Sequence, residues 1–186
     1  LGGQPLFLSP RDLQIGRGEP LVDTARVLSR YLDGIMIRTF AQQEVEDLAH
    51  YCTCPVINGL TDYCHPCQIL ADLLTVREFK CGGENDFSGL KMCYIGDGHN
   101  MANSLIVGGL TVGMSVAIGC PQSHQPHPDV LAFAAQYPGK FCMTDDIFAA
   151  AAGADVLFTD VWASMGQEAE ALERQKIFTG YQINDK

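Results

Sequence analysis

Apolar residues recur at helical spacing in several segments, and short β-branched runs separate these segments. Segment 23–32 has the helical spacing and begins at Asp23, which can cap its N-terminus, and the apolar run 34–39 that follows predicts a strand. The same order returns in a helical segment, 43–52, and a strand-like run, 55–59. The first part of the chain therefore predicts two units of a helix followed by a strand.

A longer helix is predicted over residues 65–79, with Pro66 in its first turn, where a missing N–H group is tolerated. Its apolar residues predict one buried stripe. These residues are Ile69, Leu70, Leu73, Leu74 and Phe79. The glycine-rich and polar stretch 80–86 then interrupts the pattern, and it is the expected boundary between two domains, 1–84 and 85–186.

Strands and helices continue to alternate in the second part of the chain. Strands are predicted at 90–98, 114–120, 140–144 and 155–160, and helices from about 100, near 128–136 and near 146–152. Alternating strands and helices form parallel sheets that are covered on both faces. The expected fold class is therefore α/β, with two lobes, each a parallel sheet flanked by helices, and an active-site cleft between them.

Composition narrows the class of protein. The 186 residues are 47% apolar, which is enough for a packed core, yet no apolar run approaches the roughly 20 residues of a membrane span. The net charge of −10 argues against a nucleic-acid-binding surface. The start of the chain lacks the features of a secretory signal, so a cytoplasmic location with reduced cysteines is expected.

The charge is distributed unevenly along the chain. Six of the seven arginines lie in residues 1–80, whereas residues 81–186 hold twelve acidic and only five basic side chains. This asymmetry suits an anionic ligand held by the first half and a cationic ligand held by the second.

Four of the eight cysteines form close pairs that could suggest zinc binding or a redox pair. They are Cys52, Cys54, Cys64 and Cys67. Their spacing fits no common structural zinc scheme, so no metal is expected. Three further cysteines stand inside predicted strands and are expected to pack as small core residues. They are Cys93, Cys120 and Cys142.

The segment VLFTDVWASMGQE, residues 156–168, contains the strongest candidate chemistry. Asp160 comes directly after a predicted buried strand, and Ser164, Met165 and a glycine follow it. Ligands of open parallel sheets bind beyond the carboxyl ends of the strands. Asp160 and Ser164 are therefore candidate ligand-binding residues.

The segment IGDGHN, residues 95–100, has a glycine turn between a strand and a helix. The dinucleotide-binding fingerprint requires a third glycine where Met101 stands, so this interpretation is poor. Two interpretations stay open: a tight turn made of glycines, or a turn that also presents the Asn100 amide to the cleft.

His65 and Gln68 stand three residues apart at a predicted helix N-terminus, where free backbone amides point outward. Such an end can receive a carbonyl or phosphate oxygen, whereas an isolated His at this position is more often only a helix cap. Arg38 ends a predicted strand, and its guanidinium could bind phosphate with two hydrogen bonds or be an ordinary surface charge.

Five segments, in this order and at these separations, resemble the ornithine carbamoyltransferases of the aspartate/ornithine carbamoyltransferase superfamily. They are DTARVLSRY, GIMIRT, NGLTDYCHPCQILADLLT, IGDGHN and DVWASMGQE. The HPxQ element is shared with aspartate-specific relatives, whereas SMG after an Asp marks the ornithine enzymes within this superfamily. The resemblance implies carbamoyl transfer from carbamoyl phosphate to the δ-amine of L-ornithine, which gives L-citrulline and phosphate in arginine metabolism. It also implies a homotrimer that needs no cofactor.

The resemblance assigns roles to particular residues. For carbamoyl phosphate it implies Arg38, His65 and Gln68, with Gln14 reaching a neighbouring subunit's site. For ornithine it implies Asp160 and Ser164 at the α-amino group, and Asn100 and the Met165 backbone at the α-carboxylate. Arg38, His65 and Asp160 would be the catalytic residues. Residues 1–84 would form a partial carbamoyl-phosphate-binding domain and 85–186 a partial ornithine-binding domain.

Two motifs of this family do not occur in the chain. The SxRT phosphate loop and the HCLP motif with its cysteine are absent, so a fragment with little turnover of its own is expected. Cys67, inside HPCQ, is expected to serve packing. Two alternatives stay open: a truncated, non-catalytic fragment of the family, or a carbamoyltransferase for a related amine such as putrescine or an acylated ornithine.

Overall fold

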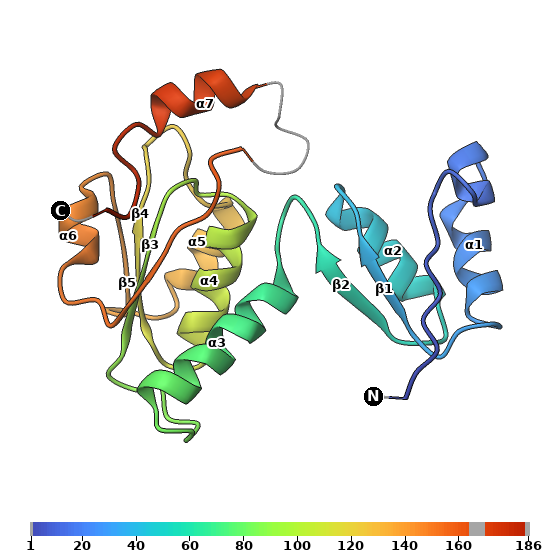
Figure 1. Ribbon diagram of the computed structural model, residues 1–186, viewed down its shortest axis with the longest axis horizontal. Coiled ribbons are helices and arrows are strands. Elements are labelled where there is room, and N and C mark those ends of the chain that lie inside the picture. Colours follow the sequence, from blue (N-terminus) through green and yellow to red (C-terminus); the bar gives the residue numbers. More distant parts are fainter. Residues whose placement is uncertain (1, 164–169, 185–186) are drawn as a thin grey trace.

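The computed structural model describes residues 2–163 and 170–184, which form two lobes (Figure 1). Each lobe has its own parallel sheet with helices against it, so the predicted α/β class is confirmed. The chain passes from the first lobe to the second through residues 61–65, which follow the last strand of the first lobe. The position of this linker decides how the two sheets face each other.

The first lobe is small. Its elements are η1 (Gln14–Arg17), α1 (Leu21–Leu28), β1 (Ile35–Arg38), α2 (Gln42–Tyr51) and β2 (Val56–Leu60). The strands β1 and β2 pair in parallel, and α1 packs against α2. Asp23 does not cap α1 as predicted, because Pro20 occupies the N-cap position and α1 begins at Leu21. Asp23 lies instead in the first turn, where its charge favours the helix dipole.

A register shift lies near the end of β1, next to the candidate site residue Arg38. Ile37 pairs with Asn58, but Arg38 pairs with Leu60, so Gly59 is skipped. A Cβ atom at Gly59 would lie 3.0 Å from the Ile37 carbonyl oxygen, and this close approach favours glycine. Irregularities of this kind change where a side chain points at the end of a strand.

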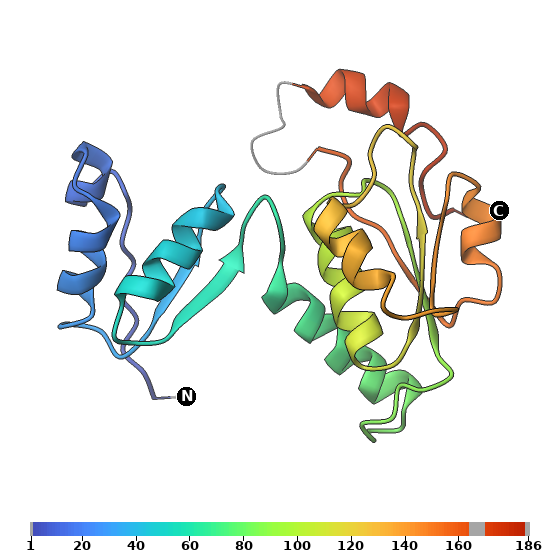
Figure 2. The same cartoon turned by 180° about the vertical axis from the view of Figure 1, so that it is seen from behind.

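The second lobe contains a four-stranded sheet in the order β5-β4-β3-β6. Its elements are α3 (Pro66–Lys80), β3 (Lys91–Ile95), α4 (Asn100–Thr111), β4 (Ser115–Gly119), α5 (Pro128–Ala134), β5 (Phe141–Thr144), α6 (Ile147–Ala151), β6 (Val156–Phe158) and α7 (Ala171–Ile177). All neighbouring strands are parallel. Helices α4 and α5 cover one face, with α3 beside them, and α6 covers the other (Figure 2).

Helix α3 packs against α4 through a close contact. A Cβ atom at Gly108 would lie 2.4 Å from Cγ1 of Ile69, so the two helices approach where α4 has no side chain. Ile69, Leu73 and Val76 are buried in the same hydrophobic cluster as Leu105 of α4. In space, α3 therefore belongs to the second lobe.

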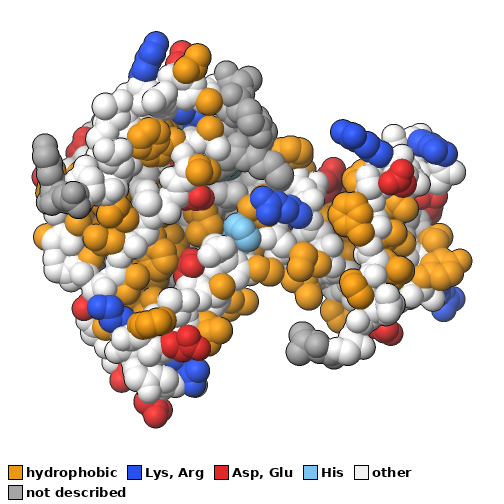
Figure 3. Space-filling model, viewed as in Figure 1, with side chains coloured by type: hydrophobic (Ala, Val, Ile, Leu, Met, Phe, Trp, Pro, Cys, Tyr) orange, Lys and Arg blue, Asp and Glu red, His pale blue; other side chains and the backbone are white. Residues whose placement is uncertain are grey.

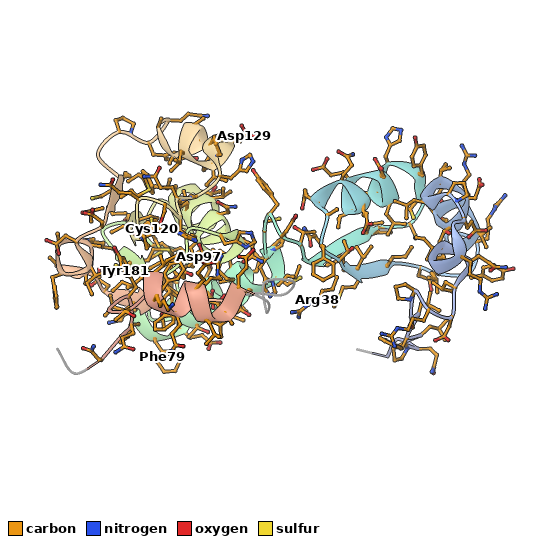
Figure 4. All side chains as sticks on the ribbon, turned by 90° about the horizontal axis from the view of Figure 1, so that it is seen from above. Arg38, Phe79, Asp97, Cys120, Asp129 and Tyr181 are labelled. Carbon is orange, nitrogen blue, oxygen red and sulfur yellow. The ribbon has the colours of Figure 1, made fainter. Side chains whose placement is uncertain are left out.

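The buried stripe of α3 is narrower than predicted. Ile69 and Leu73 are buried, but Leu70, Leu74 and Phe79 are 66%, 51% and 80% exposed. Figure 4 shows Phe79 pointing away from the lobe. The prediction was wrong for these three residues, because α3 lies on the outside of α4 and buries only one narrow side.

The cysteines divide into buried and accessible groups. Cys93 and Cys120 are buried, as predicted, but Cys142 is exposed because β5 is an edge strand and its side chains alternate between the two faces. All eight cysteines are free, and the described residues hold no group of three or more potential metal ligands. No helix among the described residues is long and apolar enough to cross a membrane.

Two neighbouring residues of α3 give a matched test of this packing. Ile69→Ala is expected to lower the free energy of unfolding by about 2–5 kcal/mol, since it removes a buried side chain, whereas Leu70→Ala is expected to change it by less than about 0.5 kcal/mol. Chemical denaturation of both variants measures the difference. Similar losses for the two variants would contradict the packing of α3 on α4.

Candidate active site

The ends of strands from both lobes meet at one cavity of about 390 Å³. Five of the predicted site residues line it, namely Arg38, His65, Gln68, Asn100 and Asp160. The space-filling view shows the hollow between the lobes, where basic, histidine and acidic side chains come near one another (Figure 3). Residues that the sequence separates by more than 120 positions thus face the same space.

Arg38 is the contribution of the first sheet. It ends β1, and Figure 4 shows it at the side of the first lobe that faces the second. Its side chain is exposed, and it forms no ion pair with any residue that the structure describes. A guanidinium without a protein carboxylate beside it keeps its donors for an anion.

His65 and Gln68 stand at the first turn of α3. His65 occupies the N-cap position, but its side chain makes no capping hydrogen bond, so capping does not explain this residue. Its Nδ1 atom is buried and has no hydrogen-bond partner among the described residues. Burial, and then the positive charge of Arg38, lower the pKa of His65 from its ordinary value of 6.5, while Asp160 and Asp72 oppose the shift. His65 is therefore neutral at pH 7.

Asp160 belongs to the opposite wall of the cavity. It follows β6, whose end is fixed to the neighbouring strand because the Thr159 hydroxyl donates to the Ile95 carbonyl oxygen at 2.9 Å. One carboxylate oxygen of Asp160 accepts from the Val161 N–H group at 2.8 Å. Burial, with the charge of Asp160 nearby, raises the pKa of Tyr94, so this phenol beside the cavity stays protonated.

Asn100 begins α4, and the glycine turn before it is tight, as one of the two interpretations predicted. A Cβ atom at Gly98 would lie 2.4 Å from the His124 carbonyl oxygen, so the turn is tight against another loop. Asn100 also lines the cavity. Its Nδ2 group donates to the Thr61 carbonyl oxygen at 2.9 Å, and its Oδ1 accepts from the Met101 N–H group at 2.8 Å.

Two further side chains of α4 hold the linker between the lobes. Asn103 Nδ2 donates to the Tyr63 carbonyl oxygen at 2.8 Å, and the His65 N–H group donates to Ser104 Oγ at 2.7 Å. Asn100, Asn103 and Ser104 are all buried and share one face of the helix. Helix α4 thus fixes the backbone that leads into His65.

A buried ion pair fixes the segment after Asp160. Arg174 of α7 donates to the carboxylate of Asp97, and both side chains are almost fully buried. The same guanidinium donates to the Trp162 carbonyl oxygen. Helix α7 is therefore bound both to the turn that precedes Asn100 and to the chain just beyond Asp160.

One predicted site residue, Gln14, lies away from the cavity. Gln14 is in η1, next to α1 at the far side of the first lobe, where its side-chain oxygen accepts from Arg17 at 3.3 Å. Its predicted role concerns a neighbouring subunit, which a single chain does not test. Ser164 and Met165 lie outside the described residues.

Sequence reasoning missed several residues around the cavity. Asp72 lines it, and Asn103 and Ser104 fix the linker beside it. Helical spacing contained a usable signal, because Asp72 is four residues after Gln68, and Asn103 and Ser104 are three and four residues after Asn100. This spacing shows that the residues share one face of their helix, but it does not show which part of the protein that face contacts.

Paired α/β lobes with donors on one side of a shared cavity and a carboxylate on the other are typical of enzymes that bring two small ligands together. A family model described as the aspartate/ornithine carbamoyltransferase carbamoyl-P binding domain matches residues 1–78. A second, described as the Asp/Orn binding domain of the same family, matches residues 88–186. The chain belongs to the aspartate/ornithine carbamoyltransferase family.

Individual relatives agree with this assignment. The chain is 53% identical to the ornithine carbamoyltransferase of Carboxydothermus hydrogenoformans, over 99% of this chain and 59% of that protein. It is 54% identical to the ornithine carbamoyltransferase of Anoxybacillus flavithermus, over 100% of this chain and 59% of that protein. The chain therefore spans about 59% of the length of these relatives.

Solved structures of similar proteins have the same fold. The ornithine carbamoyltransferase of Pyrococcus furiosus superposes with a TM-score of 0.88 at 49% identity, over 99% of this chain and 59% of that one. The anabolic enzyme of Campylobacter jejuni superposes with a TM-score of 0.89 at 37% identity, over 99% of this chain and 61% of that one.

The contact between Ser104 and the linker gives a direct test. Ser104→Ala leaves the His65 N–H group without a partner, so it is expected to cost about 1–3 kcal/mol and to speed hydrogen exchange of the His65 amide. Thr75→Ala is the matched control, because within the described part of the chain the Thr75 hydroxyl donates only to the Ala71 carbonyl of its own helix. Equal exchange of the His65 amide in both variants would refute the role of Ser104.

The neutral state of His65 gives a second test. An NMR titration of its ring is expected to show a pKa below 6.5, and Arg38→Gln is expected to raise this pKa part of the way back, because it removes a nearby positive charge. A pKa at or above 6.5 in the unaltered protein, or no change in the variant, would count against the arrangement of Arg38 and His65.

Proposed function

We propose that this chain is the core of an enzyme that transfers the carbamoyl group of carbamoyl phosphate to the δ-amine of L-ornithine. The products are L-citrulline and phosphate. The observation that carries the proposal is the single cavity at which Arg38, His65 and Gln68 face Asn100 and Asp160. The similarity to proteins named ornithine carbamoyltransferase supports the same activity.

The first lobe and the start of α3 would bind carbamoyl phosphate. Arg38 offers a guanidinium that no described carboxylate neutralises, and it would bind the phosphate. Neutral His65 would donate from Nε2, since this tautomer leaves no unbonded N–H at the buried Nδ1 atom. We assign this role to domain 1–84, and the family model that matches residues 1–78 supports it.

The opposite wall would bind ornithine. Asp160, with Ser164, would hold the α-ammonium group, and Asn100, with the Met165 backbone, would hold the α-carboxylate. The excess of acidic residues in the second half of the chain favours a cationic ligand there. We assign this role to domain 85–186, and the family model that matches residues 88–186 supports it.

The reaction follows from this arrangement. The δ-amine of ornithine has an ordinary pKa of about 10.4, so it must lose a proton before its lone pair can attack the carbamoyl carbon. A C–N bond forms, the carbonyl oxygen gains negative charge, and donors such as Arg38 and His65 stabilise it by about a few kcal/mol each. The carbonyl then re-forms as the C–O bond to phosphate breaks, phosphate leaves with the bonding pair, and the attacking nitrogen gives up its extra proton to the departing phosphate.

Assembly and location are part of the same proposal. A homotrimer would bring Gln14 of one subunit to the phosphate site of its neighbour, and its place on the far side of the first lobe suits such a role. We infer a cytoplasmic enzyme of arginine metabolism. Size-exclusion chromatography with light scattering tests the trimer.

The substrate is tested with the full product of the gene and a panel of amines. Citrulline formation from ornithine is expected to exceed carbamoylation of putrescine by on the order of 100-fold in kcat/KM, since putrescine has no α-carboxylate to pair with the Asn100 amide. An acylated ornithine, which lacks the charged α-ammonium, is also expected to react poorly. Preference for either alternative amine, or no carbamoyl transfer at all, would overturn the proposal.

Asp160 should affect one ligand more than the other. Asp160→Asn removes the negative charge opposite the α-ammonium group, so it is expected to weaken ornithine binding by on the order of 10- to 100-fold, with much less effect on carbamoyl phosphate. Separate calorimetric titrations measure both affinities. An equal loss for both ligands would indicate a general folding defect rather than a role at the amino group.

A further inference from the structure

A hydrogen-bonded pair on α3 forms part of the cavity wall. The side-chain Nε2 group of Gln68 donates to Oδ1 of Asp72 at 2.9 Å. The two residues are four positions apart on the helix, so they share one face, and both line the cavity. Gln68 is already a candidate ligand-binding residue, whereas nothing so far accounts for Asp72.

The carboxylate of Asp72 decides which way the Gln68 amide points. A glutamine amide has a donor end and an acceptor end of nearly the same size, and either end can face a ligand. An ionised carboxylate only accepts hydrogen bonds, so it binds the donor end of the amide. The acceptor, Oε1 of Gln68, is then left for the cavity, and no described residue donates to it.

Apart from this pair, the side chains expected to bind the acyl phosphate are donors. Arg38 has only N–H groups to offer, and neutral His65 donates from Nε2 when its buried Nδ1 carries no proton. The oxygen of Gln68 is therefore an acceptor among donors. A ligand that fits needs oxygens for the donors and an N–H group for this acceptor.

A carbamoyl group meets this requirement, and an acetyl group of the same size does not. Both have a carbonyl oxygen, but the carbamoyl group has an NH₂ group where the acetyl group has a methyl group. An acceptor that faces a methyl group in a closed cavity loses its hydrogen bond to water without a replacement. The phosphate parts of carbamoyl phosphate and acetyl phosphate are identical, so among the described residues the contact with Gln68 is the one that distinguishes them.

We propose that Asp72 is a positioning residue that holds the Gln68 amide with its oxygen toward the cavity, and that this orientation selects carbamoyl phosphate over acetyl phosphate. The inference rests on the proposed function, because it concerns the same carbamoyl phosphate site. The inference goes beyond that function because it explains physically why the site would bind carbamoyl phosphate better than acetyl phosphate.

The environment of Asp72 supports a specific role. Its Oδ2 atom is buried and has no hydrogen-bond partner among the described residues. Desolvation raises the pKa of Asp72, and the hydrogen bond from Gln68 and the nearby His65 act against this rise. A half-buried carboxylate is unfavourable for stability alone, whereas it is useful for fixing the direction of one amide.

The test is Asp72→Asn, which changes the hydrogen-bonding chemistry and almost nothing in size. An asparagine can donate as well as accept, so the Gln68 amide can turn and present its N–H group to the cavity. The affinities of carbamoyl phosphate and acetyl phosphate are measured by calorimetry in the full chain. The preference for carbamoyl phosphate is expected to fall by on the order of 10-fold or more.

The chain offers a matched control on α2. Gln43 Nε2 donates to Asp47 Oδ1 at 2.8 Å with the same four-residue spacing, but neither residue lines the cavity. Asp47→Asn is expected to leave the ratio of the two affinities unchanged. Gln68→Met, which removes the acceptor at similar length, gives a second reading if Asp72→Asn folds poorly, and it is expected to reduce the preference as well.

The outcomes separate this inference from the proposed function. Equal weakening of both acyl phosphates by Asp72→Asn, or an unaltered protein that binds both equally well, would overturn the role of Asp72 while leaving carbamoyl phosphate as a ligand. Failure of the unaltered protein to bind carbamoyl phosphate would overturn the proposed function and this inference together.

Discussion

The site depends on three polar side chains of α4 that hold the linker between the lobes. Asn100 and Asn103 donate to carbonyl oxygens of this linker, and Ser104 accepts from the N–H group of His65. All three are buried, where an unpaired polar group is costly, so the linker has little freedom to choose another path. The same contacts place the start of α3 at the cavity and set the first lobe against the second.

Because the linker is fixed, basic and acidic side chains stand on opposite walls of the cavity. Parallel strands have their functional residues at their carboxyl ends, and here two separate sheets direct those ends toward one space. One sheet brings the exposed guanidinium of Arg38, and the other brings the carboxylate of Asp160. Arg174 of α7 pairs with Asp97 in the turn before α4 and also bonds the Trp162 carbonyl oxygen beyond Asp160. Helix α7 therefore holds the two segments that lead to Asn100 and away from Asp160.

Much of this arrangement was predictable from sequence, and the physical reasons differ between residues. Arg38 and Asp160 could be located because each stands at the carboxyl end of an apolar strand, and the alternation of strands and helices implied a parallel sheet. The turn before Asn100 was predicted with two open roles, of which the tight turn is confirmed and the binding role stays a prediction. The local sequence pattern was enough to predict these features, because each depends on the strand or helix in which the residue itself lies.

Features that depend on a distant partner were not predictable. Periodicity placed Leu70 and Phe79 in the buried stripe of α3, but the width of that stripe depends on how α4 lies beside it. The bonds from Asn103 and Ser104 to the linker join residues about 40 positions apart, and helical spacing shows only that these residues share a face with Asn100, not that this face meets the linker. For the same reason, Asp72 became significant only when its contact with Gln68 and its place at the cavity were visible.

The central claim is that two ligands meet in one cavity whose walls α4 holds together. The most direct measurement is the affinity for carbamoyl phosphate with and without 2-aminopentanoic acid, which keeps the α-amino and α-carboxylate groups of ornithine but has no δ-amine to react. The account predicts that each ligand strengthens the binding of the other by the same factor. Affinities that do not depend on the second ligand would contradict it.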